Sequence, residues 1–236
     1  MRSPILLGLF ALFLRAALAQ TQPDVAEILK KVTETYKAAS QYEFVADATV
    51  HEARTGRDVT SHMRFAFKAP DRYRVEGSMP GMSVGDLGLG EAIIVHDGSA
   101  VWFYLPTSNQ YGSFPASALT ADAPGDLGDL NPQAMDYVMM WRYRGATGFA
   151  DTAKFLREDI IEVAGTKVAC YVVTVSPEQR GSAYTWWVDE KRYRILREDN
   201  ARSSTVFSGI KLDEPLTDEL FKFVLPRGAR KIQTQQ

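Results

Sequence analysis

The feature that most constrains the fold is a change of hydrophobic period near residue 40. Residues 24–39 repeat apolar side chains at helical spacing, with one stripe formed by Val25, Ile28, Leu29, Val32 and Tyr36. Asp24 suits an N-cap, and Glu27 three residues later completes a capping-box pattern. From residue 44 onward apolar and polar residues alternate, as they do in a strand with one wet face. The sequence therefore predicts a helix followed by an antiparallel sheet.

Strand signals continue through most of the chain. They predict strands over residues 44–50, 63–67, 73–75, 93–96, 101–105, 110–114, 155–163, 168–175, 184–189, 193–198 and 205–212. Residues 77–90, rich in Gly and Met, have no period and are predicted as a long mobile loop. A second helix is predicted over residues 132–143, capped by Asn131 with Pro132 at its first position. We expect one mainly β (α+β) domain with a long, curved antiparallel sheet.

The first 19 residues have the pattern of a secretory signal peptide. Arg2 begins a short basic start, an apolar run follows, and Ala17 and Ala19 give the small-x-small cleavage pattern. The apolar run is shorter than a membrane span, and Arg15 interrupts its end. We expect a soluble, exported mature domain over residues 20–236. The whole chain has a formal net charge of −2, which gives no electrostatic reason to expect a nucleic-acid partner.

The sequence gives little support for a catalytic nucleophile. The single cysteine, Cys170, cannot form an internal disulfide and lies in an apolar run, which indicates a small buried hydrophobe rather than a reactive thiol. Ser83 fits the G-x-S-x-G pattern of a hydrolase nucleophile elbow, which requires a strand before it and a helix after it. Pro80 precedes it and a glycine-rich segment follows, so the match is interpreted as chance. A serine esterase using Ser83 remains an alternative.

Metal and nucleotide sites are not predicted either. The three histidines, His51, His62 and His96, share no metal-binding spacing. The acids Asp122, Asp126 and Asp129 match no EF-hand loop and are interpreted as solvated loop residues. The glycines of residues 85–90 do not form a dinucleotide fingerprint. We therefore expect no catalytic residue, no metal and no cofactor.

Several predicted strands carry more apolar residues than a sheet with one wet face needs. Residues 101–105 and 168–175 are apolar on both faces, and the pair Trp186-Trp187 places an indole on each side. Methionine, the adaptable apolar side chain, gathers in the predicted loop and second helix as Met79, Met82, Met135, Met139 and Met140. Core filling under loops explains this surplus. A cavity for a hydrophobic ligand is the alternative.

Three segments resemble the LolA family of periplasmic lipoprotein carriers. Residues 95–106 (VHDGSAVWFYLP) are similar to that family's DG-x-x-[LV]-W-F-Y-x-P segment. Residues 221–228 (FKFVLPRG) are similar to its F-x-F-x-P-x-G ending. Phe65, Phe67, Lys68 and Pro70 resemble its W-x-K-x-P strand end. The order of the elements also agrees, from the first helix to the closing segment.

The resemblance implies an incomplete, strongly curved β-barrel of about eleven strands, with the two helices covering its concave apolar face. It implies a carrier, not an enzyme, that takes lipoproteins or lipids by their acyl chains from an inner-membrane transporter to an outer-membrane acceptor. It implies a periplasmic, monomeric protein with transient membrane contact. The residues expected to line the acyl cavity are Phe44, Met63, Phe65, Phe67, Tyr73, Val75, Trp102, Tyr104, Met135, Met139, Trp186 and Phe223.

One departure from the family concerns the lid. The family carries an Arg directly before the proline, which ties the sheet to the lid, whereas this chain has Ala69 there. Arg72 and Arg74 are close in sequence but lie on a different predicted strand. Related barrels also occur in periplasmic regulators that sense lipoproteins, so a sensor of the same fold is the second alternative.

Overall fold

A computed structural model of the chain describes residues 22–52, 56–84, 87–119, 140–176 and 183–232. The predicted signal peptide, Met135, Met139, the acids of residues 122–129 and most of the second predicted helix lie outside the described residues. None of the described helices is long and apolar enough to cross a membrane.

The described helices are α1 (Val25–Ala38) and the single turn α4 (Trp141–Arg144), with 3-10 turns η1 (Pro106–Ser108), η2 (Ala116–Leu119), η3 (Ala146–Phe149) and η4 (Asp218–Phe221). The first six strands are β1 (Gln41–Glu52), β2 (Arg57–Lys68), β3 (Arg72–Val84), β4 (Leu87–His96), β5 (Ala100–Leu105) and β6 (Gln110–Pro115). The others are β7 (Lys154–Val163), β8 (Thr166–Val175), β9 (Tyr184–Asp189), β10 (Ile195–Asp199), β11 (Ser203–Leu212) and β12 (Arg230–Lys231).

All twelve strands belong to one open, curved sheet, which confirms the predicted fold class. Their order is β12-β6-β5-β4-β3-β2-β1-β11-β10-β9-β8-β7. Every pairing is antiparallel except that of β12 with β6. Eleven strands were expected, and the twelfth is β12, a two-residue strand of the C-terminal segment whose sequence does not alternate. The first predicted helix is confirmed as α1, and Asp24 caps it by accepting from the Ala26 N–H at 2.9 Å.

The predicted loop over residues 77–90 is wrong, because that segment extends the β3–β4 hairpin. Ser83 pairs with Gly88 and Val84 with Leu87 beyond a register shift. The glycines that hide the strand period have a backbone role, as Gly77 shows. It adopts φ +135°, and a Cβ there would lie 2.0 Å from the carbonyl oxygen of His62.

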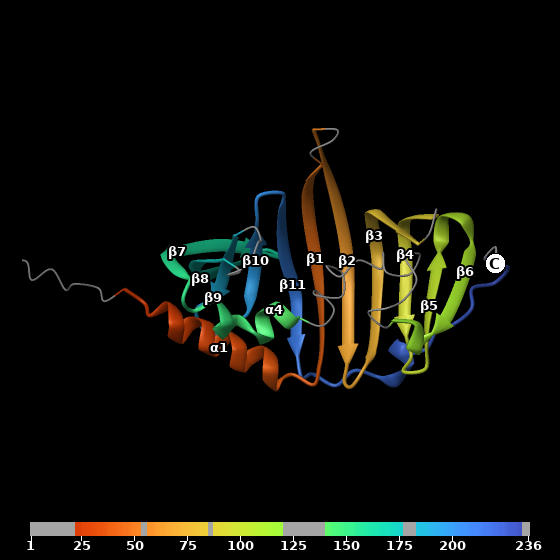
Figure 1. Cartoon of the computed structure of the whole chain (residues 1–236), viewed down its shortest axis with the longest axis horizontal. Coiled ribbons are helices and arrows are strands. Elements are labelled where there is room, and N and C mark those ends of the chain that lie inside the picture. The colour runs from red at the N-terminus through yellow and green to blue at the C-terminus, as the bar shows by residue number, and fades with distance from the viewer. Residues whose placement is uncertain (1–21, 53–55, 85–86, 120–139, 177–182, 233–236) are drawn as a thin grey trace, which may run out of the picture.

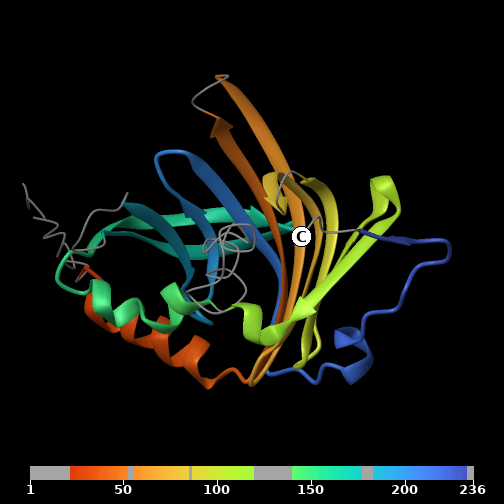
Figure 2. The same cartoon turned by 45° about the vertical axis from the view of Figure 1, so that its right-hand side comes forward.

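The sheet bends around the side that carries α1 and α4, as Figures 1 and 2 show. We call this side the inner face and the opposite side the outer face. Directly paired residues point to the same face of a sheet. The row Phe44, Phe65, Val75, Ile94 and Phe103 is paired from β1 to β5 and belongs to the inner face.

Candidate functional site

The inner face carries a continuous field of buried apolar side chains from β1 to β5. Phe44 stacks on Phe65 with ring centroids 4.8 Å apart, and Tyr42 stacks on Phe67 at 5.0 Å. Members of this field are at most 7% exposed: Tyr42, Phe44, Ala46, Phe65, Phe67, Tyr73, Val75, Ile94, Val101 and Phe103. Burial of the Tyr73 side chain raises the pKa of its phenol to about 12. The field offers dispersion and hydrophobic contact rather than acid–base chemistry.

Two helices pack on the same face over β9 to β11. The Tyr36 hydroxyl of α1 accepts a hydrogen bond from the backbone N–H of Ile195 at 3.0 Å. Tyr143 of α4 meets Trp186 and Phe207 edge-on, with centroid distances of 5.5 and 6.1 Å. Trp186 is fully buried by this arrangement. The two helices therefore cover the inner face over β9 to β11, and α4 lies at the border of the aromatic field.

A buried carboxylate attaches α4 to the sheet. Glu198 of β10, 1% exposed, accepts hydrogen bonds from Arg142 Nη1 at 2.7 Å, Tyr143 Oη at 3.1 Å and Trp186 Nε1 at 2.8 Å. The Arg142 guanidinium also lies over the Tyr184 ring at 4.2 Å. We call these contacts of Glu198 with Arg142 and Tyr143 the α4 latch.

The resemblance to the LolA family leads us to expect an arginine on the sheet that ties it to the helical lid. In the α4 latch the arginine instead lies on the helix and its carboxylate partner on the sheet. Arg72 pairs with Asp218 at 3.1 Å and Arg74 with Glu76 at 2.9 Å, both on the outer face. On the helix, Arg144 donates to the Ala39 carbonyl at 2.8 Å and lies 5.8 Å from the Phe67 ring centroid. Neither Glu198 nor Arg142 was predicted from the sequence, because Glu198 ends the predicted strand 193–198 directly after Arg197 and has no local signal of burial.

The structure separates the predicted cavity residues into two groups. Seven of the twelve share the inner face: Phe44, Met63, Phe65, Phe67, Tyr73, Val75 and Trp186. Trp102 and Tyr104 alternate with the inner residues Val101 and Phe103 along β5, and so lie on the outer face together with Phe223. Met135 and Met139 lie outside the described residues.

On the outer face, the C-terminal segment packs against the sheet. Phe223 stacks on Trp102 with centroids 5.2 Å apart and planes 4° apart. Trp102 Nε1 in turn donates to Asp97 at 2.9 Å. A cavity of about 330 Å³ lies between this segment and β3–β5, lined in part by Arg74, Glu76, Tyr104 and Phe223.

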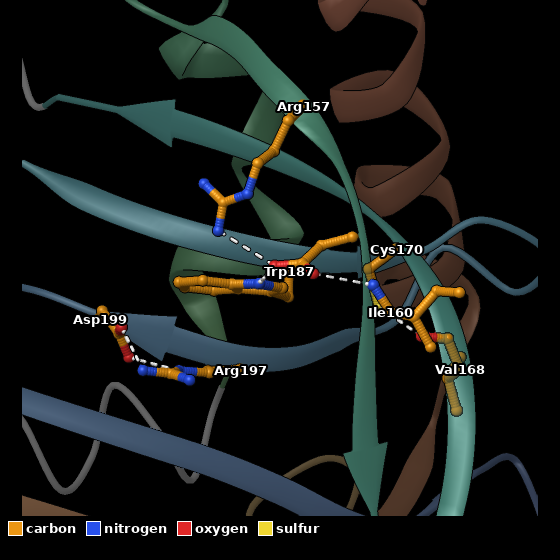
Figure 3. Close-up of polar contacts among 8 residues, drawn as sticks. Arg157, Ile160, Val168, Cys170, Trp187, Arg197 and Asp199 are labelled. Carbon is orange, nitrogen blue, oxygen red and sulfur yellow. Dashed lines mark hydrogen bonds and ion pairs between the residues drawn. The ribbon is translucent and has the colours of Figure 1, made fainter.

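The residues considered for nucleophilic chemistry are placed unfavourably. Ser83 lies within β3 and is followed by the paired strand β4, whereas a nucleophile elbow needs a helix at that point. Cys170 is a fully buried member of β8, as predicted, and its Sγ contacts the Val168 carbonyl at 3.6 Å (Figure 3). Burial raises the pKa of this thiol to about 12, with nearby carboxylates acting in the same direction.

Comparisons with known proteins agree with the fold. No protein-family model matches the chain. An uncharacterized protein of Methanocaldococcus jannaschii, MJ0687, is 24% identical over 213 residues, which cover 89% of this chain and 54% of that protein. The chain therefore spans about half the length of this archaeal relative.

Solved structures resemble the chain at low identity. LprF from Mycobacterium bovis superposes with a TM-score of 0.51 and 12% identity, covering 86% of this chain and 96% of that one. A LolA superfamily protein from Nitrosomonas europaea, NE2245, matches with a TM-score of 0.33 and 15% identity over 85% and 98%. The similarity to LprF shows a shared fold.

Proposed function

We propose that this chain is a periplasmic carrier that binds acyl chains of lipoproteins or lipids against its inner face and moves them toward the outer membrane. The observation that carries the proposal is the aromatic field of β1–β5, bordered by a helix that a few polar contacts hold in place. The signal-peptide pattern of residues 1–19 supports export. The similarity to LprF and the resemblance to the LolA family support a binding role without catalysis.

The energetic requirement of such a carrier fits the inner face. Each buried methylene contributes about 0.8 kcal/mol, so an acyl chain leaves a membrane only for a comparably large apolar surface. Phe65, Phe67 and Tyr73 supply that surface on adjacent strands. Opening the α4 latch would detach Tyr143 from Trp186 and give the acyl chain access to the field. Transfer to an acceptor then requires a site with higher affinity.

The proposal is tested by incubating the mature chain with spheroplasts of its host and analysing the soluble fraction for co-eluting acylated proteins and lipids. Met63, half-buried on the inner face, is the variant position, because Glu at the almost fully buried Phe65 or Phe67 would destabilise the fold. Leu225, 52% exposed on the C-terminal segment, provides the matched control.

We expect the unmodified chain and Leu225→Glu to release acylated material, and Met63→Glu to release much less while melting at a similar temperature. A folded, unmodified chain that elutes without acylated material contradicts the carrier proposal. Equal release by the Met63→Glu variant contradicts the assignment of the inner face.

A further inference from the structure

A second cavity of about 330 Å³ lies at one end of strands β7 to β11. Along β9, Trp186 faces α4, Trp187 faces the opposite side, and Asp189 shares the side of Trp187. Asp189 lines this cavity, as do Val168 of β8 and Ser208 of β11, which are on the outer face by their pairing. These three residues place the cavity largely on the outer face, and Phe207, which also lines it, contacts Phe44 of the aromatic field with ring centroids 5.8 Å apart.

The rim of this cavity carries unbalanced positive charge. Lys191 and Arg192 line it from the β9–β10 turn, are exposed, and form no ion pair with a carboxylate among the described residues. A third cation, Arg194, also lines it. Its Nε is buried and has no hydrogen-bond acceptor in the part of the chain that the structure describes. Among the residues that line the cavity, three cations thus accompany one carboxylate, that of Asp189, while Glu190, which does not line it, interacts electrostatically with Lys191.

The charge of Asp189 is already balanced within the protein. Its Oδ1 accepts the backbone N–H groups of Lys191 and Arg192 at 2.9 and 3.1 Å, and its Oδ2 lies 3.6 Å from Arg194 Nη2. Asp189 therefore fixes the turn that presents the two free cations. The positive field of Lys191 and Arg192 remains available to an external anion.

The rest of the lining is largely apolar. It comes from Val163, Val168, Leu196, Phe207 and Ile210. From a cationic rim above an apolar floor we infer that this cavity binds an amphiphilic anion, with its carboxylate or phosphate on Lys191, Arg192 and Arg194 and a short alkyl chain on the floor. A water molecule in the liquid occupies about 30 Å³, and if each non-hydrogen atom of the ligand with its hydrogens takes the same space, the cavity holds about eleven such atoms. That size admits a head group with a short chain, and not a whole lipid.

Octanoate, with eight carbons and two oxygens, is the probe. Its binding is followed by amide chemical shifts, with Gly209 reporting on the cavity and Phe65 on the inner face. 1-Octanol tests the chain without the charge, and propionate tests the charge with little chain. Octyl phosphate distinguishes a phosphate head group from a carboxylate. The double variant Lys191→Gln/Arg192→Gln removes the rim charge at exposed positions, and Lys30→Gln/Lys37→Gln on α1 removes the same charge elsewhere.

We expect octanoate or octyl phosphate to shift the Gly209 amide at concentrations where 1-octanol and propionate do not. We expect the rim variant to weaken this binding about tenfold and the α1 variant to leave it unchanged. Shifts confined to the Phe65 region overturn the inference, as does equal binding of 1-octanol or an unaffected rim variant. Because the readout is local to the cavity, its failure leaves the acyl-carrier proposal standing, and the reverse also holds.

Discussion

Replacing Glu198 tests whether the α4 latch holds the helix on the sheet. From the described residues its carboxylate accepts three hydrogen bonds, one of them from the cationic Arg142. Hydrogen bonds to charged groups contribute about 1.5–3 kcal/mol each, against about 0.5–1.5 for neutral pairs. Glu198→Gln keeps the shape but removes a negative charge that pairs with the Arg142 side chain, which is 17% exposed. We expect the free energy of unfolding to fall by about 3 kcal/mol.

This loss corresponds to a melting temperature lower by about 6–12 °C for a chain of this size. A double-mutant cycle with Arg142→Leu, measured by urea denaturation, isolates the pair, and we expect a coupling energy above about 1 kcal/mol. Glu219→Gln is the matched control, because Glu219 pairs with Lys222 at 3.1 Å on the surface and its loss should leave the melting temperature unchanged. Additive effects of the two latch variants, within about 0.5 kcal/mol, refute the latch.

Three further outcomes are expected. Partial burial of Asp97 is outweighed by hydrogen bonds from Ser99, Ala100 and Trp102, which hold the pKa of its carboxyl at about 2. The ionised carboxylate therefore stabilises the fold by at most about 1 kcal/mol after solvent screening, an effect that is present above pH 4 and lost as the pH falls toward 2. The melting temperature of Asp97→Asn should match that of the unmodified chain only near pH 2. Cys170 should resist iodoacetamide at pH 8 until urea unfolds the chain, and rapid labelling of the native protein would contradict its burial. Phe223→Ala should speed amide exchange at residues 230–231 about two- to tenfold, and unchanged exchange there would show that the Trp102 stack does not hold the C-terminal segment.

The parts of the fold that follow from local periodicity were predictable. The stripe of α1 and the alternation of β1, β2 and the first half of β3 each depend on residues within one element, and they suffice for the fold class. The β3–β4 extension was missed because Gly77 serves a backbone approach to His62, which comes from another strand. No pattern within residues 77–90 records that partner.

The candidate site was predictable only in part, because alternation separates two faces without identifying which one the helices cover. Phe65 and Trp102 both lie in predicted strands, yet they face opposite sides once β2 to β5 are paired. The α4 latch joins Arg142 to Glu198 across 56 positions of sequence. A contact between residues so far apart in the sequence depends on the order of the strands in the sheet, which places β11 beside β1. No local sequence signal specifies that order.

The central claim is that the inner face binds acyl chains, and photo-crosslinking tests it most directly. A diazirine-bearing fatty acid is loaded onto the mature chain, irradiated, and its attachment sites are mapped by mass spectrometry of the peptides. If acyl chains bind the inner face, we expect cross-links on inner-face residues of β2 and β3, such as Met63 and Tyr73. Cross-links confined to the outer face around Trp102 and Phe223, or none on a folded protein, would contradict it.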